Sequence, residues 1–461
     1  MGWRSAIRAT KNAVWRTILL PSIHALRSEP VARELALLER SQWLDPMQLQ
    51  GLQAEKLTAL LRHCRENIPF YRDRIPADLP LDVDMHAPFQ MLSALPVLEK
   101  EEVTRLSEQT ARRLGPHDRF VVRRTAGTSG RPLVVFADHV ANARSLAARA
   151  RCLGWFGVRI GDRECRLWGR SLSRNERLKA RVRDYLLNRH RISVSELEPE
   201  RIMETATAAL QSCPDYIYGY ASMVFQFGDA IARLSAADDT GLKVAVLTSE
   251  ASSQLQRDKS SRLLGIPVVD EFGCSEVDII AHQCPAGSYH IIAENLLVEV
   301  LPVSNEDPLR GEVVVTDLNN TLMPLVRYRI GDEVVLKPGK CACGRSLPMI
   351  ASVGGRTLYQ YFHLPDGRRM HAYVFEYFID DLLEAGIGVR QFQVVQETRD
   401  TIAIYLVLEH DSDSNRRGVE MQVKMRLAGE VGCSVSVVLN FVERIVPKPG
   451  TKFECFQPLA H

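Results

Sequence analysis

A run of small residues with hydroxyl groups, residues 125–132 (TAGTSGRP), is the first feature of the sequence that could bind a substrate. Its glycines let backbone N–H groups approach an anion, and its Thr and Ser hydroxyls can donate hydrogen bonds to phosphate oxygens. No Gly-Lys-Ser/Thr follows, so the run is not a Walker loop. It joins two strand-like segments. The pattern predicts a phosphate-binding hairpin tip, although an ordinary flexible hairpin has the same composition.

Four later segments carry groups that suit the same kind of ligand. In residues 270–276 (DEFGCSE) an aromatic residue and a glycine precede a carboxylate, and residues 328–332 (YRIGD) end a strand in Gly-Asp. Carboxylate oxygens bind Mg²⁺ or accept hydrogen bonds from hydroxyls. Residues 355–356 (Gly-Arg) lie in a glycine-rich hinge, and residues 447–453 place Lys452 on a Pro/Gly loop. Singly each segment is a weak indication; their order along the chain is the informative feature.

Together with residues 125–132, this order resembles the adenylate-forming superfamily of acyl-CoA synthetases. More closely it resembles the phenylacetate-CoA ligase branch, including homologues in capsular polysaccharide loci. The resemblance implies an α/β fold with a large N-terminal adenylate-forming domain of mixed sheets and helices, residues 1–353, and a small mobile α+β domain, residues 354–461, beyond the hinge. Within the large domain, residues 1–118 would be a helical lead-in and residues 119–353 would hold the nucleotide and the acid.

The resemblance also implies a role for each motif. The loop would hold the β and γ phosphates of ATP, Glu276 would bind Mg²⁺, Phe272 would stack on adenine, and Asp332 would accept both ribose hydroxyls. Lys452 would bridge the substrate carboxylate and the α-phosphate, so the catalytic set is Lys452, Glu276 and Thr128. The residues expected to bind the nucleotide are Thr125, Gly127, Thr128, Ser129, Gly130, Ser249, Glu250, Glu271, Phe272, Gly273, Cys274, Ser275, Asp332 and Arg356.

Three positions depart from the family pattern. Phe272 stands where relatives often carry Tyr, which keeps the stacking and loses a hydroxyl hydrogen bond. Thr451 stands where relatives usually have the Gly before the lysine, and Ala221 stands where they often have Pro. By family position the carboxylic acid would lie beside Trp168, Tyr220 and Ala221. An aryl or acyl pocket is expected there, and the sequence does not fix which acid it takes.

Three cysteines and a histidine predict a structural metal site. Cys284 and His290 precede Cys341 and Cys343 by about fifty residues, and a Cys-x-Cys pair is too short for an unstrained disulfide. With the other two residues on a neighbouring strand, the pair could close a tetrahedral Cys₃His site for Zn²⁺. Members of the phenylacetate-CoA ligase branch resemble this arrangement. His282 is an alternative fourth ligand, and four free residues are the remaining interpretation.

Two basic stretches occur in a chain whose net charge is only +2, which excludes a whole-chain attraction to nucleic acid. Residues 170–191 hold eight Lys or Arg against two acidic residues, with Tyr185 alone as an aromatic residue. They form either a solvated helix face or a site for an anionic partner: the phosphates of coenzyme A, a nucleotide-sugar acceptor or acidic lipid. Residues 1–28 hold five Lys or Arg and no acidic residue. They predict either a packed lead-in helix or a helix on a membrane surface.

Composition places the chain in the soluble globular class. Its 461 residues, 46% of them hydrophobic, bury a large core. No apolar run approaches the roughly 18 residues of a membrane helix, and ten cysteines are too few for a disulfide scaffold. We therefore expect a cytoplasmic protein whose membrane association, if present, depends on residues 1–28. The sequence leaves the oligomeric state open.

Hydrophobic periodicity predicts the elements that position these groups. Helices are expected over 34–43 and from Asp45-Pro46 onward, with a hairpin over 120–138. Alternating helices and strands between 141 and 270 predict an α/β sheet, and residues 297–336 predict a small antiparallel unit. The C-terminal elements are expected at 374–384 (helix), 391–396 and 401–408 (strands), 417–427 (helix) and 434–441 (strand).

The sequence therefore predicts an ATP-dependent carboxylate ligase that forms an acyl-adenylate and transfers the acyl group to coenzyme A. Two alternatives stay open. The acceptor could instead be the amine of a sugar in polysaccharide biosynthesis, which the two basic stretches favour slightly. The chain could also be a nucleotide-binding scaffold that has lost catalysis, for which Thr451 and Phe272 are the motivation.

Overall fold

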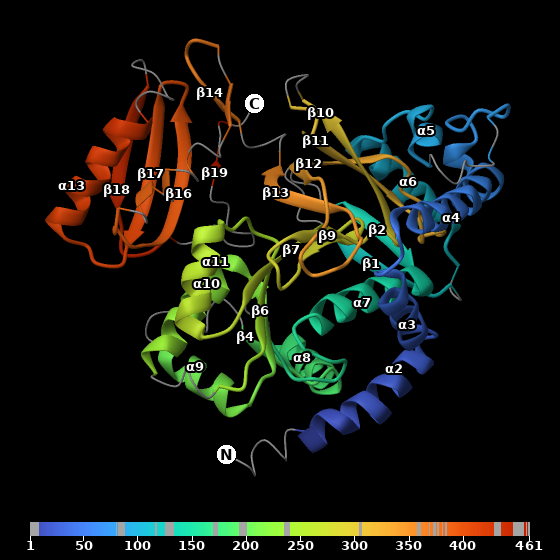
Figure 1. The fold of residues 1–461 in the computed structure, drawn as a ribbon, viewed down its shortest axis with the longest axis horizontal. Coiled ribbons are helices and arrows are strands. Elements are labelled where there is room, and N and C mark those ends of the chain that lie inside the picture. The colour runs from blue at the N-terminus through green and yellow to red at the C-terminus, as the bar shows by residue number, and fades with distance from the viewer. Residues whose placement is uncertain are drawn as a thin grey trace.

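The molecule has a large body built on an extended sheet and a smaller body formed by the C-terminal part of the chain (Figure 1). The structure is a computed structural model. It describes residues 9–79, 81, 88–115, 118–124, 133–168, 174–192, 201–234, 240–303, 307–356, 361–367, 369–371, 375, 378–379, 381–382, 385–427, 435–445, 456–457 and 459.

Eleven strands form the main sheet, in the order β10-β11-β12-β13-β9-β8-β7-β6-β5-β3-β4. Pairing is parallel from β4 to β7 and antiparallel from β7 to β10, so the sheet changes its pairing at β7. The strands are β3 (Glu164–Leu167), β4 (Arg189–Ile192), β5 (Tyr216–Tyr220), β6 (Val244–Thr248), β7 (Val268–Cys274), β8 (Asp278–Gln283), β9 (Tyr289–Ile291), β10 (Leu296–Pro302), β11 (Arg310–Asp317), β12 (Tyr328–Lys337) and β13 (Met349–Arg356).

Helices cover both faces of the parallel half. One face packs on α9, α10 and α11 through a core that includes Val224, Phe227 and Leu264. The other face packs on the end of α7 through Leu153 and Tyr218. Both faces are therefore buried, which is why these strands are nearly continuous apolar runs. The helices are α7 (His139–Gly154), α8 (Arg174–Leu186), α9 (Ile202–Gln211), α10 (Ala221–Arg233) and α11 (Gln254–Leu264).

The largest core cluster joins the antiparallel half to the N-terminal helices. α4 begins at Pro46 because the Asp45 carboxylate accepts the Gln48 N–H at 2.9 Å while the Gln48 side chain accepts the Asp45 N–H at 3.1 Å. Leu57 and Leu61 of this helix are fully buried. The elements here are α3 (Val31–Ser41), α4 (Pro46–Asn67), η2 (Pro69–Tyr71), α5 (Pro88–Ser93) and α6 (Lys100–Arg113).

The hairpin expected over residues 120–138 is confirmed. β1 (Phe120–Arg124) pairs antiparallel with β2 (Val134–Asp138), with Phe120 opposite Asp138 and Arg124 opposite Val134. Asp138 then caps α7, because its carboxylate accepts the N–H groups of Val140 and Ala141. The tip that would bind phosphate, residues 125–132, lies outside the described residues.

The described part of the basic N-terminus is a helix packed on the large body. Residues 9–26 are helical and include η1 (Trp15–Leu19) and α2 (Leu20–Leu26). Asn12 is buried, and its amide donates to Asp215 at 2.7 Å. Arg16 donates to Asp162 at 2.7 Å. These contacts favour the packed lead-in helix for residues 9–26. No described helix combines the length and the apolar character needed to cross a membrane.

The C-terminal body is a four-stranded sheet in the order β18-β17-β16-β19, covered by α13. Its core includes Phe375, Leu406 and Val419. Its elements are β14 (Tyr361–His363), β15 (Arg369–His371), β16 (Val389–Thr398), β17 (Thr401–Leu408), α13 (Asp413–Gln422), η5 (Val423–Leu427), β18 (Ser436–Phe441) and β19 (Phe456–Gln457). An ion pair between Lys259 of α11 and Glu409 after β17 joins it to the large body.

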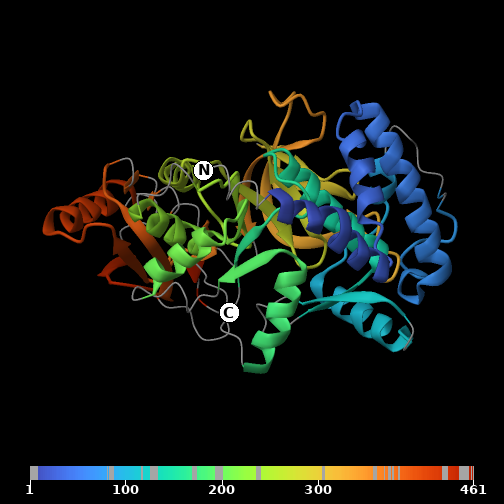
Figure 2. The ribbon, with the colours of Figure 1, turned by 90° about the horizontal axis from the view of Figure 1, so that it is seen from below.

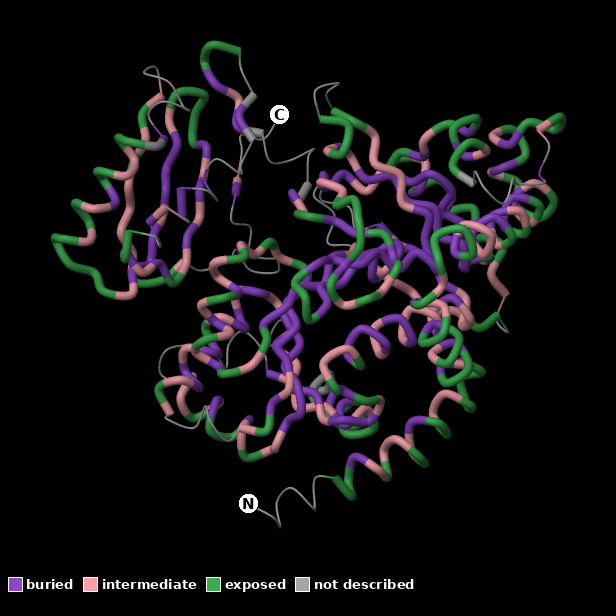
Figure 3. The backbone as a smooth tube through the Cα atoms, in the orientation of Figure 1, coloured by how far each residue is buried: buried purple, intermediate pink, exposed green. Residues whose placement is uncertain are grey.

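The structure confirms the α/β fold class with a large body and a smaller C-terminal α+β body. Figure 3 shows the buried strands at the centre of the large body and exposed turns on the helices around it. One expectation was incomplete, because residues 297–336 do not form a separate unit. Hydrogen bonds between β12 and β13, and between β13 and β9, join them to the main sheet.

Candidate functional site

Some of the segments singled out in the sequence follow neighbouring parallel strands at their carboxyl ends. In the sheet Tyr220, the last residue of β5, lies opposite Thr248, the last residue of β6, and Thr248 lies opposite Glu271 of β7. The segments that follow these strands are therefore neighbours, although they lie far apart in the sequence. In open α/β sheets ligands bind outside the carboxyl ends of the strands.

An aromatic pair forms one side of this edge. The rings of Trp168, directly after β3, and Tyr220 are 4.4 Å apart between centroids and inclined by 32°. Arg166 places its guanidinium 5.6 Å from the centre of the Trp168 ring. Ala221, the first residue of α10, is buried beside them. The residues expected to bind the acid are thus brought together, and they present aromatic surface.

The segment after β6 holds the start of α10. Ser249 has a positive φ of 67°, which is uncommon for a residue with a side chain. The turn brings the Glu250 carboxylate to the helix start, where it accepts the Ser222 N–H at 2.7 Å and the Ser222 hydroxyl at 3.1 Å. Glu250 therefore acts as a cap for the backbone beside Tyr220.

The end of β7 requires a glycine, and the turn that follows the strand carries the candidate magnesium ligand. A Cβ on Gly273 would lie 2.2 Å from the Asp278 carbonyl oxygen, so only glycine fits. Glu276 is buried, and its Oε1 accepts a hydrogen bond from the Tyr328 hydroxyl at 3.1 Å. Its Oε2 is buried without a hydrogen-bond partner among the described residues. A carboxylate held in this way fits the oxygen ligand that Mg²⁺ prefers.

Asp332 reaches the same turn from β12. Asp332 is buried and lies opposite Arg356 in the β12–β13 ladder. The residue before it, Gly331, has a positive φ of 82°. Burial raises the pKa of the Cys274 thiol well above its ordinary value, and the charges of Glu276 and Asp332 raise it further. The thiol is therefore neutral and lies within electrostatic reach of both carboxylates.

Two residues expected at the nucleotide have their side chains in the protein interior. The Glu271 carboxylate accepts two hydrogen bonds from Arg149, at 3.1 and 3.2 Å, and one from the Tyr218 hydroxyl at 2.6 Å. Phe272 is 7% exposed and belongs to the largest core cluster. In this conformation Glu271 can contact a nucleotide only through its backbone, and Phe272 only through a small part of its ring.

Several predicted residues cannot be placed. Thr125, Gly127, Thr128, Ser129, Gly130 and Lys452 lie outside the described residues, and the Arg356 side chain is likewise not described. Their roles stay predictions. Gly273 lies near the end of β7, and Ser275 lies in the turn between β7 and Glu276.

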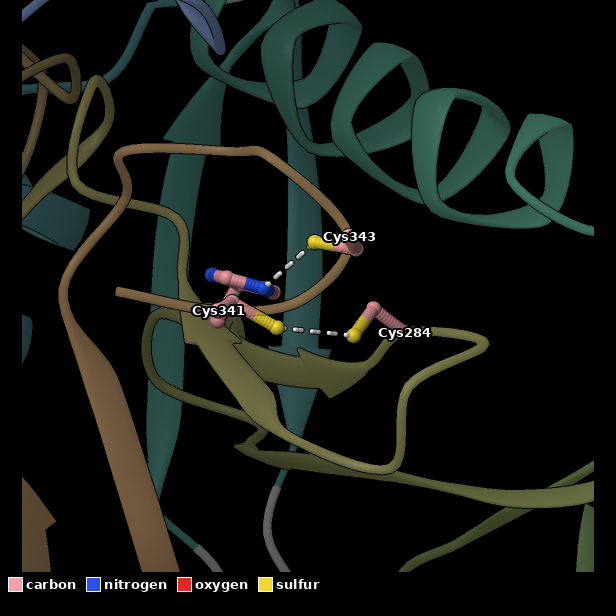
Figure 4. A group of neighbouring side chains, drawn as sticks. Cys284, Cys341 and Cys343 are labelled. Atoms are coloured by element: carbon pink, nitrogen blue, oxygen red, sulfur yellow. Dashed lines mark hydrogen bonds between the residues drawn. The ribbon is translucent and has the colours of Figure 1, made fainter. Parts of the chain in front are cut away.

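The four predicted metal ligands form one cluster. Cys284 follows the end of β8, His290 lies in β9, and Cys341 and Cys343 lie between β12 and β13. Ligand atoms of Cys284, His290, Cys341 and Cys343 all lie within 4.8 Å of one another. The sulfurs of Cys284 and Cys341 are 3.6 Å apart, and His290 Nε2 lies 3.2 Å from Cys343 Sγ (Figure 4). Tetrahedral Zn–S bonds of about 2.3 Å imply sulfurs about 3.8 Å apart, so the donor set fits Zn²⁺.

Backbone contacts orient these donors. His290 Nδ1 lies 3.1 Å from the Leu347 carbonyl oxygen, which it can bind as a donor, so Nε2 faces the cysteines. Burial lowers the pKa of His290 to about 4, which keeps the imidazole neutral. Against the opposing effect of burial, hydrogen bonds from the Cys343 backbone and Ser288 hold the pKa of Cys341 below its ordinary value. A neutral imidazole is the form of histidine that binds metal, and a lowered thiol pKa eases the loss of the proton that metal binding requires.

His282, the alternative ligand, lies outside the cluster. Its Nδ1 is 2.7 Å from the Gln283 carbonyl oxygen, and its ring contacts Trp155 edge to face at 5.9 Å. Of the two histidines that the sequence left open, His290 is the one in the cluster.

Solved structures with the same fold include a 2-hydroxyisobutyryl-CoA ligase. In its postadenylation state, in complex with R3-HIB-AMP, it superposes with a TM-score of 0.70 at 16% identity over 91% of both chains. In its thioesterification state, in complex with 2-HIB-AMP and CoA, the TM-score is 0.55 at 17% identity over the same shares. At this identity the likeness concerns the fold, and it agrees with the two-body architecture.

Sequence relatives agree with the resemblance found in the motifs. The phenylacetate-coenzyme A ligase of Thermus thermophilus is 27% identical over 353 residues, which are 67% of this chain and 70% of that protein. Protein CapK of Staphylococcus aureus is 22% identical over 383 residues, 78% of this chain and 79% of that protein. Residues 366–457 match the CapK C-terminal domain family. Over most of its length the chain is similar to the phenylacetate-CoA ligase branch of the adenylate-forming superfamily and to CapK.

Sequence reasoning missed the residues that support the motifs. Arg149 holds Glu271 and also donates to Asp278 at 2.7 Å, and Tyr328 holds Glu276. Asp278, whose carbonyl oxygen lies against Gly273, has a positive φ of 65°. None of these supports has a local signal, because Arg149 lies more than a hundred residues from both carboxylates. The one available indication was the number of carboxylates between positions 270 and 278, because buried carboxylates need a cation nearby.

Proposed function

We propose that the chain is an ATP-dependent carboxylate ligase that forms an acyl-adenylate and passes the acyl group to coenzyme A. In the first step a carboxylate oxygen attacks the α-phosphorus of ATP and pyrophosphate leaves. In the second step a thiol sulfur attacks the acyl carbon, and AMP leaves as the thiol loses its proton. The main support is Glu276, a buried carboxylate with one unpaired oxygen among the described residues, in the turn after β7, whose neighbours in the sheet include β6 and, beyond it, β5.

Each residue contributes by binding or orientation. Glu276 would hold Mg²⁺, which neutralises charge on the triphosphate when bound. Asp332 would accept ribose hydroxyls, since it reaches the same turn from β12. Trp168 and Tyr220 would contact the organic part of the acid, which favours an aryl or acyl group. Lys452 and Thr128 are assigned by family resemblance alone, at the α-phosphate and the β and γ phosphates.

We also propose that the C-terminal body rotates between the two steps, about Gly354 and Gly355. The higher TM-score against the postadenylation state than against the thioesterification state of one related fold supports an arrangement near the former. Glycines absorb large backbone changes at small energetic cost. The proposed boundary between residues 353 and 354 lies within β13.

Acid-dependent exchange between ATP and pyrophosphate tests the first step. The wild-type chain should catalyse exchange with at least one member of a panel of aryl, fatty and amino acids. Glu276→Gln should lower the rate by roughly a hundredfold or more, because it removes a charge that acts on the reacting phosphates. Glu39→Gln, at an exposed carboxylate of α3, is the control and should leave the rate unchanged. Absence of exchange across the panel would support the catalytically inactive scaffold instead.

The acceptor is tested by product analysis. With coenzyme A present, a thioester should form and AMP release should accelerate. A second candidate, transfer to the amine of a sugar in polysaccharide biosynthesis, is favoured by the match of residues 366–457 to the CapK C-terminal domain. If exchange occurs and coenzyme A leaves AMP release unchanged, while an amino sugar accelerates it, the coenzyme A proposal is wrong and the adenylation proposal stands.

We propose that Cys284, His290, Cys341 and Cys343 bind a structural Zn²⁺, with no open position for a catalytic water. The support is the spacing and orientation of four donors that fit a tetrahedral site. Metal analysis should find about one zinc per chain, and Cys341→Ser should remove it and lower the unfolding temperature. Cys213→Ser, at a cysteine away from the cluster, is the matched control. A zinc content near zero in gently purified wild-type protein would end this proposal.

A further inference from the structure

α8, within the basic stretch 170–191, carries large apolar side chains that point to solvent. Leu178 is 67% exposed, Val182 is 55% exposed and Tyr185 is 66% exposed. The helix stands out from the large body at the lower edge of Figure 2. Single exposed apolar residues are ordinary, whereas several on one helix face are typical of a surface that contacts a protein, a membrane or a ligand.

These residues share one face of the helix, and the opposite face holds the helix to the protein. With about 100° between successive residues, Leu178, Val182 and Tyr185 fall within about 60° of one another. Ala180 and Asp184 are buried, and they lie about 200° and 240° round from Leu178. The apolar face is therefore turned away from the body and is not part of its core.

Cations flank the apolar face on both sides. Lys179 and Arg183 fall on one flank and Arg181 on the other, and all three are exposed. The one acidic residue between positions 178 and 186, Asp184, is buried and binds Arg191 through hydrogen bonds of 2.8 and 3.0 Å. The exposed part of this segment is thus apolar and cationic.

The N-terminal helix extends this surface. The Trp15 indole donates to the Tyr185 carbonyl oxygen at 3.1 Å, and the Trp15 and Tyr185 rings are 5.5 Å apart. Along the same helix, Ile18 is 59% exposed and Lys11 is exposed. Two helices far apart in the sequence therefore present apolar and basic side chains next to each other.

We propose that this surface, formed by α8 and residues 11–18, binds the headgroup region of an anionic membrane. An apolar helix face with basic flanks inserts its apolar side chains between acyl chains and places its cations at lipid phosphates. A second copy of the chain is a poorer occupant, because pairing like surfaces would bring the cationic flanks together. The proposal is independent of the ligase activity and assigns an interaction to the described helices.

Vesicle flotation of the full chain tests the proposal, with phosphatidylcholine vesicles and with vesicles that also contain phosphatidylglycerol. Binding should require the anionic lipid and weaken as salt is added, because salt screens the charges. The double variant Leu178→Glu, Val182→Glu should weaken binding roughly tenfold or more, because two apolar anchors are replaced by anions. Lys179→Glu with Arg183→Glu should lower binding to anionic vesicles in the same direction.

The control double variant is Met421→Glu with Met425→Glu, in the C-terminal body. These methionines are 56% and 66% exposed, close to the values for Val182 and Leu178. The control should bind vesicles like the wild type, and unfolding temperatures of all variants should agree. Wild-type protein that stays unbound on anionic vesicles, or equal loss of binding in both double variants, would overturn the proposal. A dimer that the Leu178→Glu, Val182→Glu variant dissociates would show that a second copy is the occupant.

Discussion

Single buried residues at the site have protonation states set by their surroundings, and Asp270 is the clearest case. Burial raises its pKa to about 6, against the lowering effects of Arg257 and of the hydrogen bond from the Tyr289 hydroxyl. Its other oxygen, Oδ1, has no partner among the described residues. Ionised Asp270 is therefore a destabilising charge inside the large body.

Asp270→Asn should make the protein more stable than the wild type at pH 8 but not at pH 4. A raised carboxyl pKa favours the folded state while the group is protonated, and this advantage is lost as pH rises from the unfolded value of 3.8 through about 6. A shift of about two pKa units corresponds to about 3 kcal/mol of unfolding free energy. Urea unfolding at both pH values measures it, with Asp73→Asn, at an exposed carboxylate, as control. A stability difference that is the same at pH 4 and pH 8 would contradict this assignment.

At the scale of elements, the sequence predicts what depends on local signals. The Asp45-Pro46 start of α4 and the 120–138 hairpin are confirmed because a cap and a strand-like run act over a few residues. The joining of β12, β13 and β9 into the main sheet was not predicted, since it rests on pairing between distant segments. The candidate ligands of the metal cluster could be predicted because cysteine and histidine are recognisable by residue type. The contact of Arg149 with Glu271 could not, because it joins distant segments.

The N-terminal helix is an element whose sequence suggested two uses and whose described part is packed. Asn12 is buried between Asp162 and Asp215, which accept its amide hydrogens at 3.3 and 2.7 Å. The helix also lies so close to Gly161 that a Cβ there would be 2.7 Å from the Arg16 backbone nitrogen. Residues 9–26 are therefore part of the fold, and only their outer side is available to a membrane.

Asn12→Ala should lower the unfolding free energy by about 1 to 3 kcal/mol, because it leaves buried carboxylates with fewer donors. Thr17→Ala, on the exposed side of the same helix, should change it by less than about 0.5 kcal/mol. Urea unfolding followed by circular dichroism measures both. Equal effects of the two substitutions would show that the helix is not an integral part of the large body.

At the scale of the whole molecule, the two bodies touch through contacts of modest strength. Lys259 of α11 pairs with Glu409, and their side chains are 31% and 29% exposed. A pair this exposed contributes roughly 1 kcal/mol or less. Such a contact is strong enough to favour one arrangement and weak enough to allow another, as the proposed rotation requires.

Lys259→Ala should shift the population away from the arrangement described here by up to about fivefold, without changing the unfolding temperature. Single-molecule energy transfer between a dye on each body would report the shift. Lys424→Ala, at an exposed lysine of the C-terminal body, should leave the distribution unchanged. High salt should reproduce the effect in the wild type and add little in the variant, since salt screens the same pair. Identical distributions in wild type and variant would rule out this role.

The position of the metal cluster has a mechanical consequence. Cys341 and Cys343 lie on the connection that leads into β13, and β13 contains the glycines about which the C-terminal body is proposed to turn. Cys284 and His290 tie that connection to β8 and β9. A bound ion would thus keep the near side of the pivot stationary. Loss of the ion would then make the orientation of the C-terminal body more variable, and this effect would precede any unfolding of the protein.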